Sequence, residues 1–289
     1  MVIRRFVRLA VVLSFAGALV APGSSASAAA ACGDVLTSNT VIRTDLFCPG
    51  GGLVVGADGV TVDFRGHAIF GTGSGTGVDI LAGNVTVKNG SVAGFGIGID
   101  VDIQGQGEGT RIERMTVTNN GLGIGTLDRN GGAIESSTVS HNAGGGINIG
   151  ISHNWTVDHN TVVGNAGRGI RVGQQSDGAL ITNNFVAQNS DIGIAVLGST
   201  GTYSGNAMRG NGGAGMSLVE DAVPALASAY LIANNVANDN AGVGISACVD
   251  TSSSPCASGM HDGGGNAANH NAGAPQCINI VCSLNRGRS

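Results

Sequence analysis

Two short segments of this chain place an aspartate between branched apolar residues in the same way. Asp79 lies in the sequence VDI and Asp100 in the sequence IDV, with Asp102 two residues further on. If these segments are strands of neighbouring layers, their carboxyl groups come within about 4.8 Å and repel each other unless a cation neutralises them. Calcium is a hard cation that prefers oxygen ligands. We therefore expect a calcium site at Asp79, Asp100 and Asp102.

The same position carries an arginine further along the chain. Counted by the repeat described below, the column of Asp79 and Asp100 continues to Asn148 and Arg171. Arg171 lies three layers beyond Asp100, about 14 Å along the axis of a stack of strands. A guanidinium group suits recognition of carboxylates, so this column combines two opposite charges on one surface.

A second acidic column lies seven residues before a recurring asparagine. It contains Glu113, Glu135 and Asp158. Its neutralising neighbours in the sequence are Arg111, Arg114 and His159. Both acidic columns could bind a ligand, but the ordinary solvated face of a sheet is also polar, and that alternative remains open for both.

A repeat in the low twenties organises most of the chain. The recurring residue is an asparagine, usually followed by a Gly-Ile-like step, and successive copies lie 22, 23, 24, 22, 29 and 31 residues apart. A second asparagine column lies five residues before the first, and stacked amides can bond to one another and to the backbone of a bend. The first column is Asn120, Asn142, Asn165, Asn189, Asn211, Asn240 and Asn271. The second is Asn160, Asn184, Asn206, Asn235 and Asn266.

Apolar residues recur at fixed distances from these asparagines. They lie eight and three residues before the marker and again a few residues after it, as Val157, Val162 and Ile170 do around Asn165. This spacing predicts three short parallel strands per turn, with aliphatic side chains stacked inward. The two wider gaps contain insertions at 219–228 and 249–262.

Repeat units such as TVDHNTVVGNAGRGIRV (156–172) and LITNNFVAQNSDIGIAV (180–196) resemble the right-handed parallel β-helix of the pectin-lyase-like superfamily. The resemblance covers about Val60 to Cys282. It implies an all-β fold of about eight to nine three-strand coils with an asparagine ladder. The superfamily includes lyases, hydrolases, epimerases, tailspikes and adhesins, so the fold alone does not give a function.

Members of that superfamily that act on acidic sugars use aspartates to hold calcium or substrate, and an arginine or lysine as base. By this resemblance Arg171 is the candidate base or sugar-carboxylate contact, and Asn148, Arg168, Glu113, Glu135 and Asp158 are the candidate substrate-binding residues. The polygalacturonase-like signatures NTD, GHG and RIK are not present in the sequence, nor is the arginine-proline motif of pectate lyases.

The N-terminal residues predict export. Three arginines precede an apolar run at 9–20 and a tract of small residues, which is typical of a secretory signal peptide at 1–31, with a twin-arginine route as an alternative. We expect a cap at 32–59, the β-helix at 60–282 and a tail at 283–289. The protein is then secreted and extracellular, without stable membrane insertion, and we expect a monomer.

Six cysteines lie at the two ends of the repeat region. An even number in an exported chain favours disulfides, and zinc is the weaker alternative because the ligand spacing does not fit. The expected pairs by proximity are Cys32 with Cys48, Cys248 with Cys256, and Cys277 with Cys282. Without the signal segment the net charge falls from −5 to −8, because three basic and no acidic residues leave with it. An acidic surface disfavours nucleic acid as a partner.

The sequence therefore predicts an exported protein that engages an extracellular polysaccharide or cell-surface glycan, with lyase-like activity as one option. The alternative is a non-catalytic envelope or adhesion scaffold. The sequence itself does not decide whether the protein is an enzyme. Calcium is the one cofactor it suggests.

Overall fold

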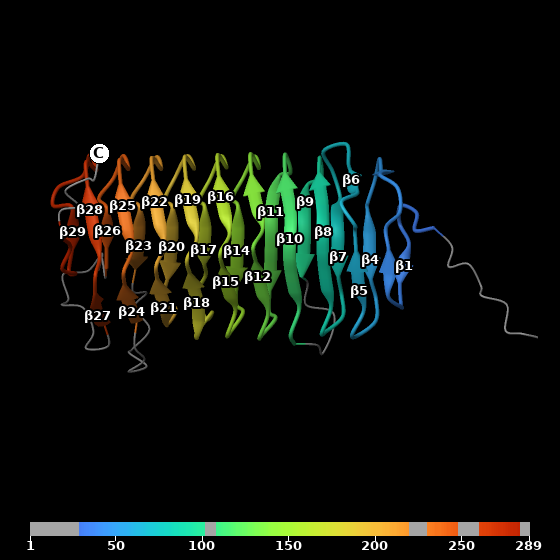
Figure 1. The fold of residues 1–289 in the computed structure, drawn as a ribbon, viewed down its shortest axis with the longest axis horizontal. Helices are drawn as coiled ribbons and strands as arrows, with labels where there is room; N and C mark the ends of the chain where they lie inside the picture. The colour runs from blue at the N-terminus through green and yellow to red at the C-terminus, as the bar shows by residue number, and fades with distance from the viewer. Residues whose placement is uncertain (1–28, 102–107, 220–229, 248–259, 284–289) are drawn as a thin grey trace, which may run out of the picture.

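The computed structural model describes residues 29–101, 108–219, 230–247 and 260–283. These residues form one elongated parallel β-helix whose coils follow one another along the long axis, as Figure 1 shows. The described part of the chain is all-β, and none of it is a helix that could cross a membrane. Each coil contributes short strands that pair in parallel with those of the next coil, and these strands form three stacks along the tube.

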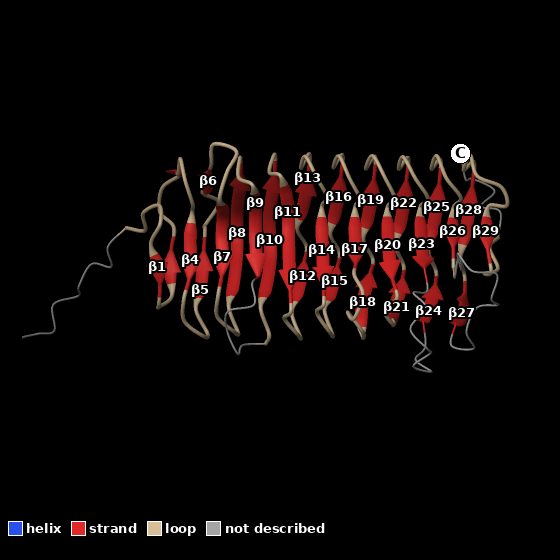
Figure 2. Ribbon diagram, turned by 180° about the vertical axis from the view of Figure 1, so that it is seen from behind, coloured by secondary structure: helices blue, strands red, loops and turns tan. Residues whose placement is uncertain are grey.

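Stack 1 is an eleven-stranded parallel sheet, which faces the viewer in Figure 2. It contains β1 (Val35–Leu36), β4 (Leu53–Val55), β7 (Thr76–Ile80), β9 (Ile97–Val101), β11 (Leu122–Leu127), β14 (Ile147–Gly150), β17 (Ile170–Val172), β20 (Ile194–Leu197), β23 (Met216–Val219), β26 (Ile245–Ser246) and β29 (Cys277–Ile278). Nine of these strands, β7 to β29, lie in the segment predicted as the β-helix. The stack is longer than the eight to nine coils expected, because β1 and β4 of segment 32–59 continue the same sheet.

Stacks 2 and 3 cover the other sides of the tube and are joined where β8 (Thr86–Ala93) and β10 (Arg111–Thr118) run through both. Stack 2 also contains β2 (Thr40–Val41), β5 (Thr61–Asp63), β12 (Ala133–Glu135), β15 (Thr156–Asp158), β18 (Ala179–Thr182), β21 (Gly201–Ser204), β24 (Tyr230–Ala233) and β27 (Met260–Gly264). Stack 3 also contains β3 (Leu46–Phe47), β6 (Ala68–Phe70), β13 (Thr138–Ser140), β16 (Thr161–Val163), β19 (Phe185–Ala187), β22 (Ala207–Arg209), β25 (Val236–Asn238) and β28 (Ala267–Asn269).

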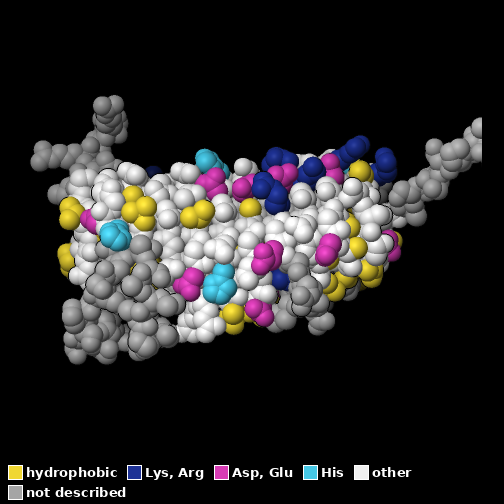
Figure 3. All heavy atoms as spheres, turned by 90° about the horizontal axis from the view of Figure 1, so that it is seen from below, with side chains coloured by type: hydrophobic (Ala, Val, Ile, Leu, Met, Phe, Trp, Pro, Cys, Tyr) yellow, Lys and Arg dark blue, Asp and Glu magenta, His cyan; other side chains and the backbone are white. Residues whose placement is uncertain are grey.

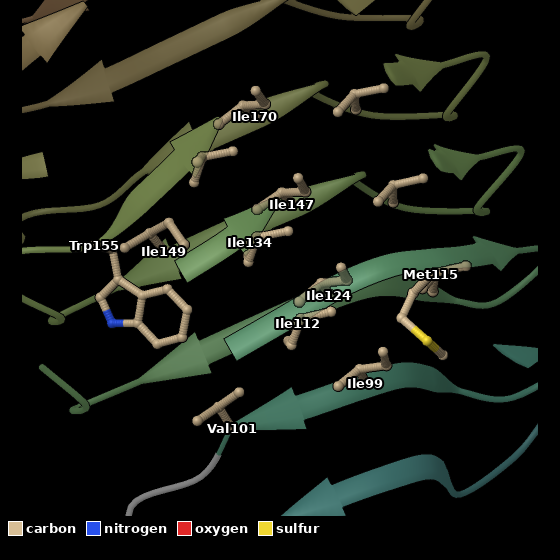
Figure 4. Packing of buried hydrophobic residues seen from close by; sticks show 14 of the residues in the cluster. Ile99, Val101, Ile112, Met115, Ile124, Ile134, Ile147, Ile149, Trp155 and Ile170 are labelled. Carbon is tan, nitrogen blue, oxygen red and sulfur yellow. The ribbon is translucent and has the colours of Figure 1, made fainter. Parts of the chain in front are cut away.

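The interior is made of aliphatic ladders, because in-register stacking places equivalent side chains directly above one another. Ile124, Ile147 and Ile170 are in register on neighbouring strands and all are buried. Figure 4 shows this row continuing from Ile99 and facing a second row that includes Ile112 and Ile134. The predicted inward columns are confirmed, and burial of these side chains is the main stabilising contribution of the core.

Both asparagine columns form ladders at the bends. Asn165 Nδ2 donates to Asn189 Oδ1 at 2.9 Å and to the carbonyl oxygen of Val139 at 3.1 Å, and its backbone N–H also donates to Asn189 Oδ1. The second column repeats this arrangement at the preceding bend, where Asn160 Nδ2 donates to Asn184 Oδ1 at 3.1 Å. Each amide thus satisfies backbone groups that a tight bend would leave unpaired. The predicted asparagine ladder is confirmed.

The third bend of the coil has a ladder of serines that the sequence reasoning missed. Ser152, Ser176 and Ser199 are fully buried. The backbone N–H of Ser152 donates to Ser176 Oγ at 3.2 Å, and that of Ser176 donates to Ser199 Oγ at 2.8 Å. A small hydroxyl group performs here the role that the asparagine amide performs at the other two bends.

One column of glycines is needed for close approach and not for a left-handed backbone. A Cβ on Gly146 would lie 2.5 Å from Val162 Cγ1 and 2.9 Å from Asn165 Nδ2. Gly123 and Gly169 show the same clash one coil before and after. The Gly-Ile step therefore lets stack 1 pass close to the asparagine ladder. Other glycines, such as Gly164 with φ +67°, do occupy left-handed bends.

Disulfides close both ends of the described coil. Cys32 bonds to Cys48 and Cys277 bonds to Cys282, as predicted. Cys248 and Cys256 lie outside the described residues. At the C-terminal end the first ladder finishes on Gln276, whose Oε1 accepts from Asn271 Nδ2 at 2.8 Å.

Candidate functional site

A hollow of about 260 Å³ lies on the outer face of stack 1, over β11, β14 and β17. These strands lie side by side near the middle of the sheet in Figure 2. The hollow brings together three of the residues predicted from the sequence. Its lining residues are Leu122, Gly145, Ile147, Asn148, Arg168 and Arg171.

Two glycines, which have no side chain, open this surface. Leu122, Gly145 and Arg168 occupy equivalent positions on three successive coils, so Gly145 leaves a gap between two long side chains. Gly125 leaves a second gap in the column of Asp100, Asn148 and Arg171. A Cβ on Gly125 would lie only 3.1 Å from Asp100 Oδ1, so the Asp100 carboxyl group reaches toward the space above this glycine.

Arg171 is partly buried and held by a neutral partner. Its Nη1 donates to Asn148 Oδ1 at 2.8 Å, one coil away on β14. The same nitrogen would lie 2.9 Å from a Cβ on Gly173, so the guanidinium folds back over that glycine. Burial and, secondarily, the nearby positive charge of Arg168 lower the pKa of Arg171. Both causes make this cation less stable, so an anion in the hollow would be favoured there.

Arg168 has a carboxylate partner that the sequence reasoning missed. Its Nε donates to Asp191 Oδ2 at 3.3 Å, and the two side chains are 35% and 49% exposed. Asp191 lies two residues after ladder residue Asn189, and Arg168 lies three residues after Asn165. The signal in the sequence for this pair was an arginine and an aspartate at neighbouring positions of two consecutive repeats.

Asp79 and Asp100 are in register on β7 and β9, as the repeat predicted. Asp102, the third predicted calcium ligand, lies outside the described residues. Within the described ranges no group of three or more acidic, histidine or cysteine side chains is placed to hold a metal ion. Calcium usually takes six to eight oxygen ligands, and two neighbouring carboxyl groups supply only part of such a set. The calcium site stays a prediction.

The second acidic column lies on stack 2, away from the hollow. Glu113, Glu135 and Asp158 are in register there, and an arginine or histidine side chain of the protein contacts each of them. Arg111 lies 2.5 Å from Glu135, Arg114 lies 2.6 Å from Glu113, and His159 lies 2.5 Å from Asp158. Lys88, which the sequence reasoning overlooked, is in register with Glu113. In Figure 3 most visible Lys and Arg side chains gather toward the N-terminal end of the coil, with acidic ones between them.

Asp158 is the most fully bonded carboxylate of this column. Burial by itself would raise the pKa of Asp158, but hydrogen bonds from Thr182, His159 and Asn183 outweigh it and lower the pKa below 3.8. The Thr182 hydroxyl donates to Oδ1 at 2.5 Å and Asn183 Nδ2 donates to the same atom at 3.0 Å. These hydrogen bonds from the protein already occupy the Asp158 carboxylate. The column is therefore a bonded network on the surface and not an open binding site.

The chain belongs to the family described as right handed beta helix region, whose sequence model matches residues 30–186. The fold and the ladders described above agree with that membership. No curated protein matches the chain.

Two epimerases are among the solved structures that share the fold. A mutant of the periplasmic alginate epimerase AlgG aligns with a TM-score of 0.53 and 14% identity, covering 86% of this chain and 73% of that one. The A-module of the mannuronan C-5 epimerase AlgE6 of Azotobacter vinelandii aligns with a TM-score of 0.52 and 19% identity, covering 75% of this chain and 62% of that one. At these identities the likeness shows the fold.

Proposed function

We propose that this exported protein engages an acidic polysaccharide along the outer face of stack 1, with Arg171 holding a carboxylate of a sugar. The observation that carries the proposal is the hollow, which is lined by two arginines, Arg168 and Arg171. The chain is acidic overall, with a net charge of −5, so this cluster is a local exception. The two epimerases of similar fold are named for alginate and mannuronan, which supports a glycan as the ligand class.

The geometry suits a sugar carboxylate. Arg171 is oriented by Asn148 and lines a hollow whose wall also includes the side chain of Leu122. An apolar side chain fits the C–H face of a pyranose ring, while a fixed guanidinium can bind both oxygens of its carboxylate. The lowered pKa of Arg171 makes pairing with an anion more favourable than at an exposed arginine.

The finer part of the proposal is a lyase-like reaction at the same place, in which Arg171 acts as the base instead of holding the carboxylate. Its neutral form would remove the proton next to the sugar carboxylate. The electron pair of that C–H bond would form a carbon–carbon double bond, and the glycosidic oxygen would leave with its electrons and take a proton from water. Burial lowers the pKa of Arg171, which is the direction that a base requires.

The test is binding and turnover on a panel of acidic and neutral polysaccharides. We expect binding to at least one acidic polymer, and about a ten-fold weaker affinity for Arg171→Gln, since one charge-assisted contact is worth about 1.4 kcal/mol or more. The matched control is Arg209→Gln, because Arg209 pairs with Asp239 on the surface of stack 3, away from the hollow. Absence of binding to every acidic polymer would overturn the proposal.

Absorbance of an unsaturated product decides between the two forms of the proposal. Binding with product formation that Arg171→Gln abolishes supports the lyase. Binding without product from any polymer supports the alternative, a non-catalytic envelope or adhesion scaffold.

A further inference from the structure

The hollow on stack 1 opens at one glycine. Leu122, Gly145 and Arg168 are equivalent residues of three successive coils, and all three are partly exposed. A Cβ on Gly145 would lie 3.7 Å from Leu122 Cδ1 and 3.3 Å from the carbonyl oxygen of Arg168. The place of the missing side chain is therefore part of the hollow, with Leu122 on one side of it and Arg168 on the other.

The coil itself does not require a glycine at position 145. Gly145 is not in the left-handed conformation, and the contact of 3.3 Å calls for a shift of only a few tenths of an ångström. The next residue, Gly146, differs because its Cβ would lie 2.5 Å from Val162 Cγ1 in the core. The reason for a glycine at 145 thus lies on the outer surface and not in the packing of the coil.

The hollow is closed toward the N-terminus by the side chain of Leu122. Gly125 has no side chain of its own, but it is buried. Leu122 Cδ2 and Asp100 Oδ1 would lie 3.2 Å and 3.1 Å from a Cβ at this glycine, so they occupy the space above it. A ligand in the hollow meets Leu122 before it can reach the next coil.

The hollow is also closed beyond Arg171. Ala195 follows Arg171 in the column and is only 1% exposed, so its side chain offers no contact to a ligand. Gly173 is buried as well, because the guanidinium of Arg171 folds over it. The open part of the face therefore extends from Gly145 and Asn148 on one coil to Arg171 on the next.

The size of this opening suits one sugar. Its volume of about 260 Å³ is below the range of roughly 300–1,000 Å³ for pockets that hold drug-sized ligands. The opening crosses a single interval between coils, which is about 4.8 Å. It has room for one ring with its substituents and not for a row of sugars.

From this enclosure we infer that the site takes a single acidic sugar unit of a glycan, and that Gly145 is the specificity-determining residue that admits it. The inference rests on the proposed function, because it gives the size of the ligand at the same site. Arg171 binds the carboxylate of this unit, and the side chain of Leu122 packs against its ring. The sugars before and after it stay in solvent, so a polymer is held through one of its units at a time.

A length series tests the single-unit site without any variant. The methyl glycosides of galacturonate and of mannuronate, with one sugar and with six, compete at constant ionic strength with a fluorescent hexasaccharide of the same uronate. Six equivalent units give six ways to bind. We therefore expect the hexasaccharide to bind about six-fold tighter than the monosaccharide, and both to displace the fluorescent ligand completely.

Variants at Gly145 test its role. Gly145→Ala places a methyl group in the hollow and should weaken monosaccharide binding by about ten-fold, and Gly145→Leu should abolish it. The matched control is Gly150→Ala on the same coil, which should leave the affinity unchanged. A Cβ on Gly150 would lie 3.2 Å from the carbonyl oxygen of Thr126, so the contact is equally tight, but Gly150 does not line the hollow. Melting temperatures show whether the two alanine variants are equally stable.

The outcomes separate the inference from the proposed function. Failure of the wild-type protein to bind either hexasaccharide counts against the proposed function itself. A hexasaccharide that binds more than about ten-fold tighter than its monosaccharide overturns the inference and leaves the proposed function standing. An unchanged affinity in Gly145→Ala, or an equal loss in Gly150→Ala, also overturns it. If Gly145→Ala is unstable, the length series decides alone.

Discussion

Arg171 Nη1 and Asn148 Oδ1 are 2.8 Å apart on neighbouring strands, and this bond fixes the guanidinium at the edge of the hollow on stack 1. An uncharged partner orients the arginine without neutralising it. The consequence is a cation that is partly desolvated and available to an anionic ligand.

Removing this partner should weaken ligand binding while the fold persists. We expect Asn148→Ala to lower the affinity for an acidic oligosaccharide by about three- to ten-fold, because Arg171 gains freedom that binding must then restrict. Asn148→Asp should weaken binding further, since its carboxylate would compete with the ligand for Arg171. Calorimetric titration of both variants checks the order. An affinity that rises in the aspartate variant would contradict the role given to Arg171.

The asparagine ladder should be costly to interrupt. Asn184 is buried, and its Nδ2 donates to Asn206 Oδ1 and to the carbonyl oxygen of Val157. We expect Asn184→Ala to lower the free energy of unfolding by about 1–3 kcal/mol, because buried amide and carbonyl groups lose their partners. Urea unfolding measures the difference.

The control for this prediction is set by backbone conformation. Asn119 is exposed but has φ +55°, so an alanine there would add strain of about 1–2 kcal/mol. Asn119→Gly, which adopts that φ freely, should cost less than about 0.5 kcal/mol. If Asn119→Gly and Asn184→Ala cost the same, the ladder is not the source of the effect.

The lowered pKa of Asp158 predicts a defined pH dependence. Its contribution to stability is present above the unfolded pKa of 3.8 and is lost as pH falls through the lower folded pKa. Acid unfolding followed by circular dichroism should therefore show that the wild-type protein is more stable than Asp158→Asn at about pH 5 to 6. This difference in stability should shrink below about pH 4. Asp128→Asn is a control on an exposed, left-handed residue. An advantage that grows on acidification would refute the assignment.

Calcium should raise the melting temperature if Asp79 and Asp100 help to hold it. We expect stabilisation at millimolar calcium, loss of this effect in the double variant Asp79→Asn with Asp100→Asn, and retention in Glu113→Gln. Glu113 is the matched acidic control because Arg114 neutralises it on stack 2. Melting curves that ignore both calcium and chelator would remove the metal site.

Reduction of the disulfides should loosen the ends of the coil before its middle. Cys32–Cys48 and Cys277–Cys282 join segments next to the first and last strands of stack 1. We expect faster hydrogen exchange near β1 and β29, with β14 and β17 still protected, because each coil is held mainly by its immediate neighbours. Uniform loss of protection along the tube would speak against independent end closure.

The sequence by itself determined the coil. A period in the low twenties, two asparagine columns and branched apolar residues at fixed offsets can all be satisfied at once by in-register parallel stacking. For this reason the register of Asp79 with Asp100, and of Glu113 with Glu135, could be predicted without a structure. The end disulfides followed from proximity of the cysteines along the chain.

Only the tertiary structure decided which surface is hollow and which charges are compensated. The Arg168–Asp191 pair depends on side-chain directions at two bends, and the hollow depends on where Gly145 interrupts a column of larger residues. The left-handed φ of Asn119 and the close approach at Gly146 depend on how tightly the backbone turns around the ladder. A repeat fixes which residues stack, because stacking is periodic. It does not fix which neighbours meet across a bend, because that contact is set by local backbone geometry.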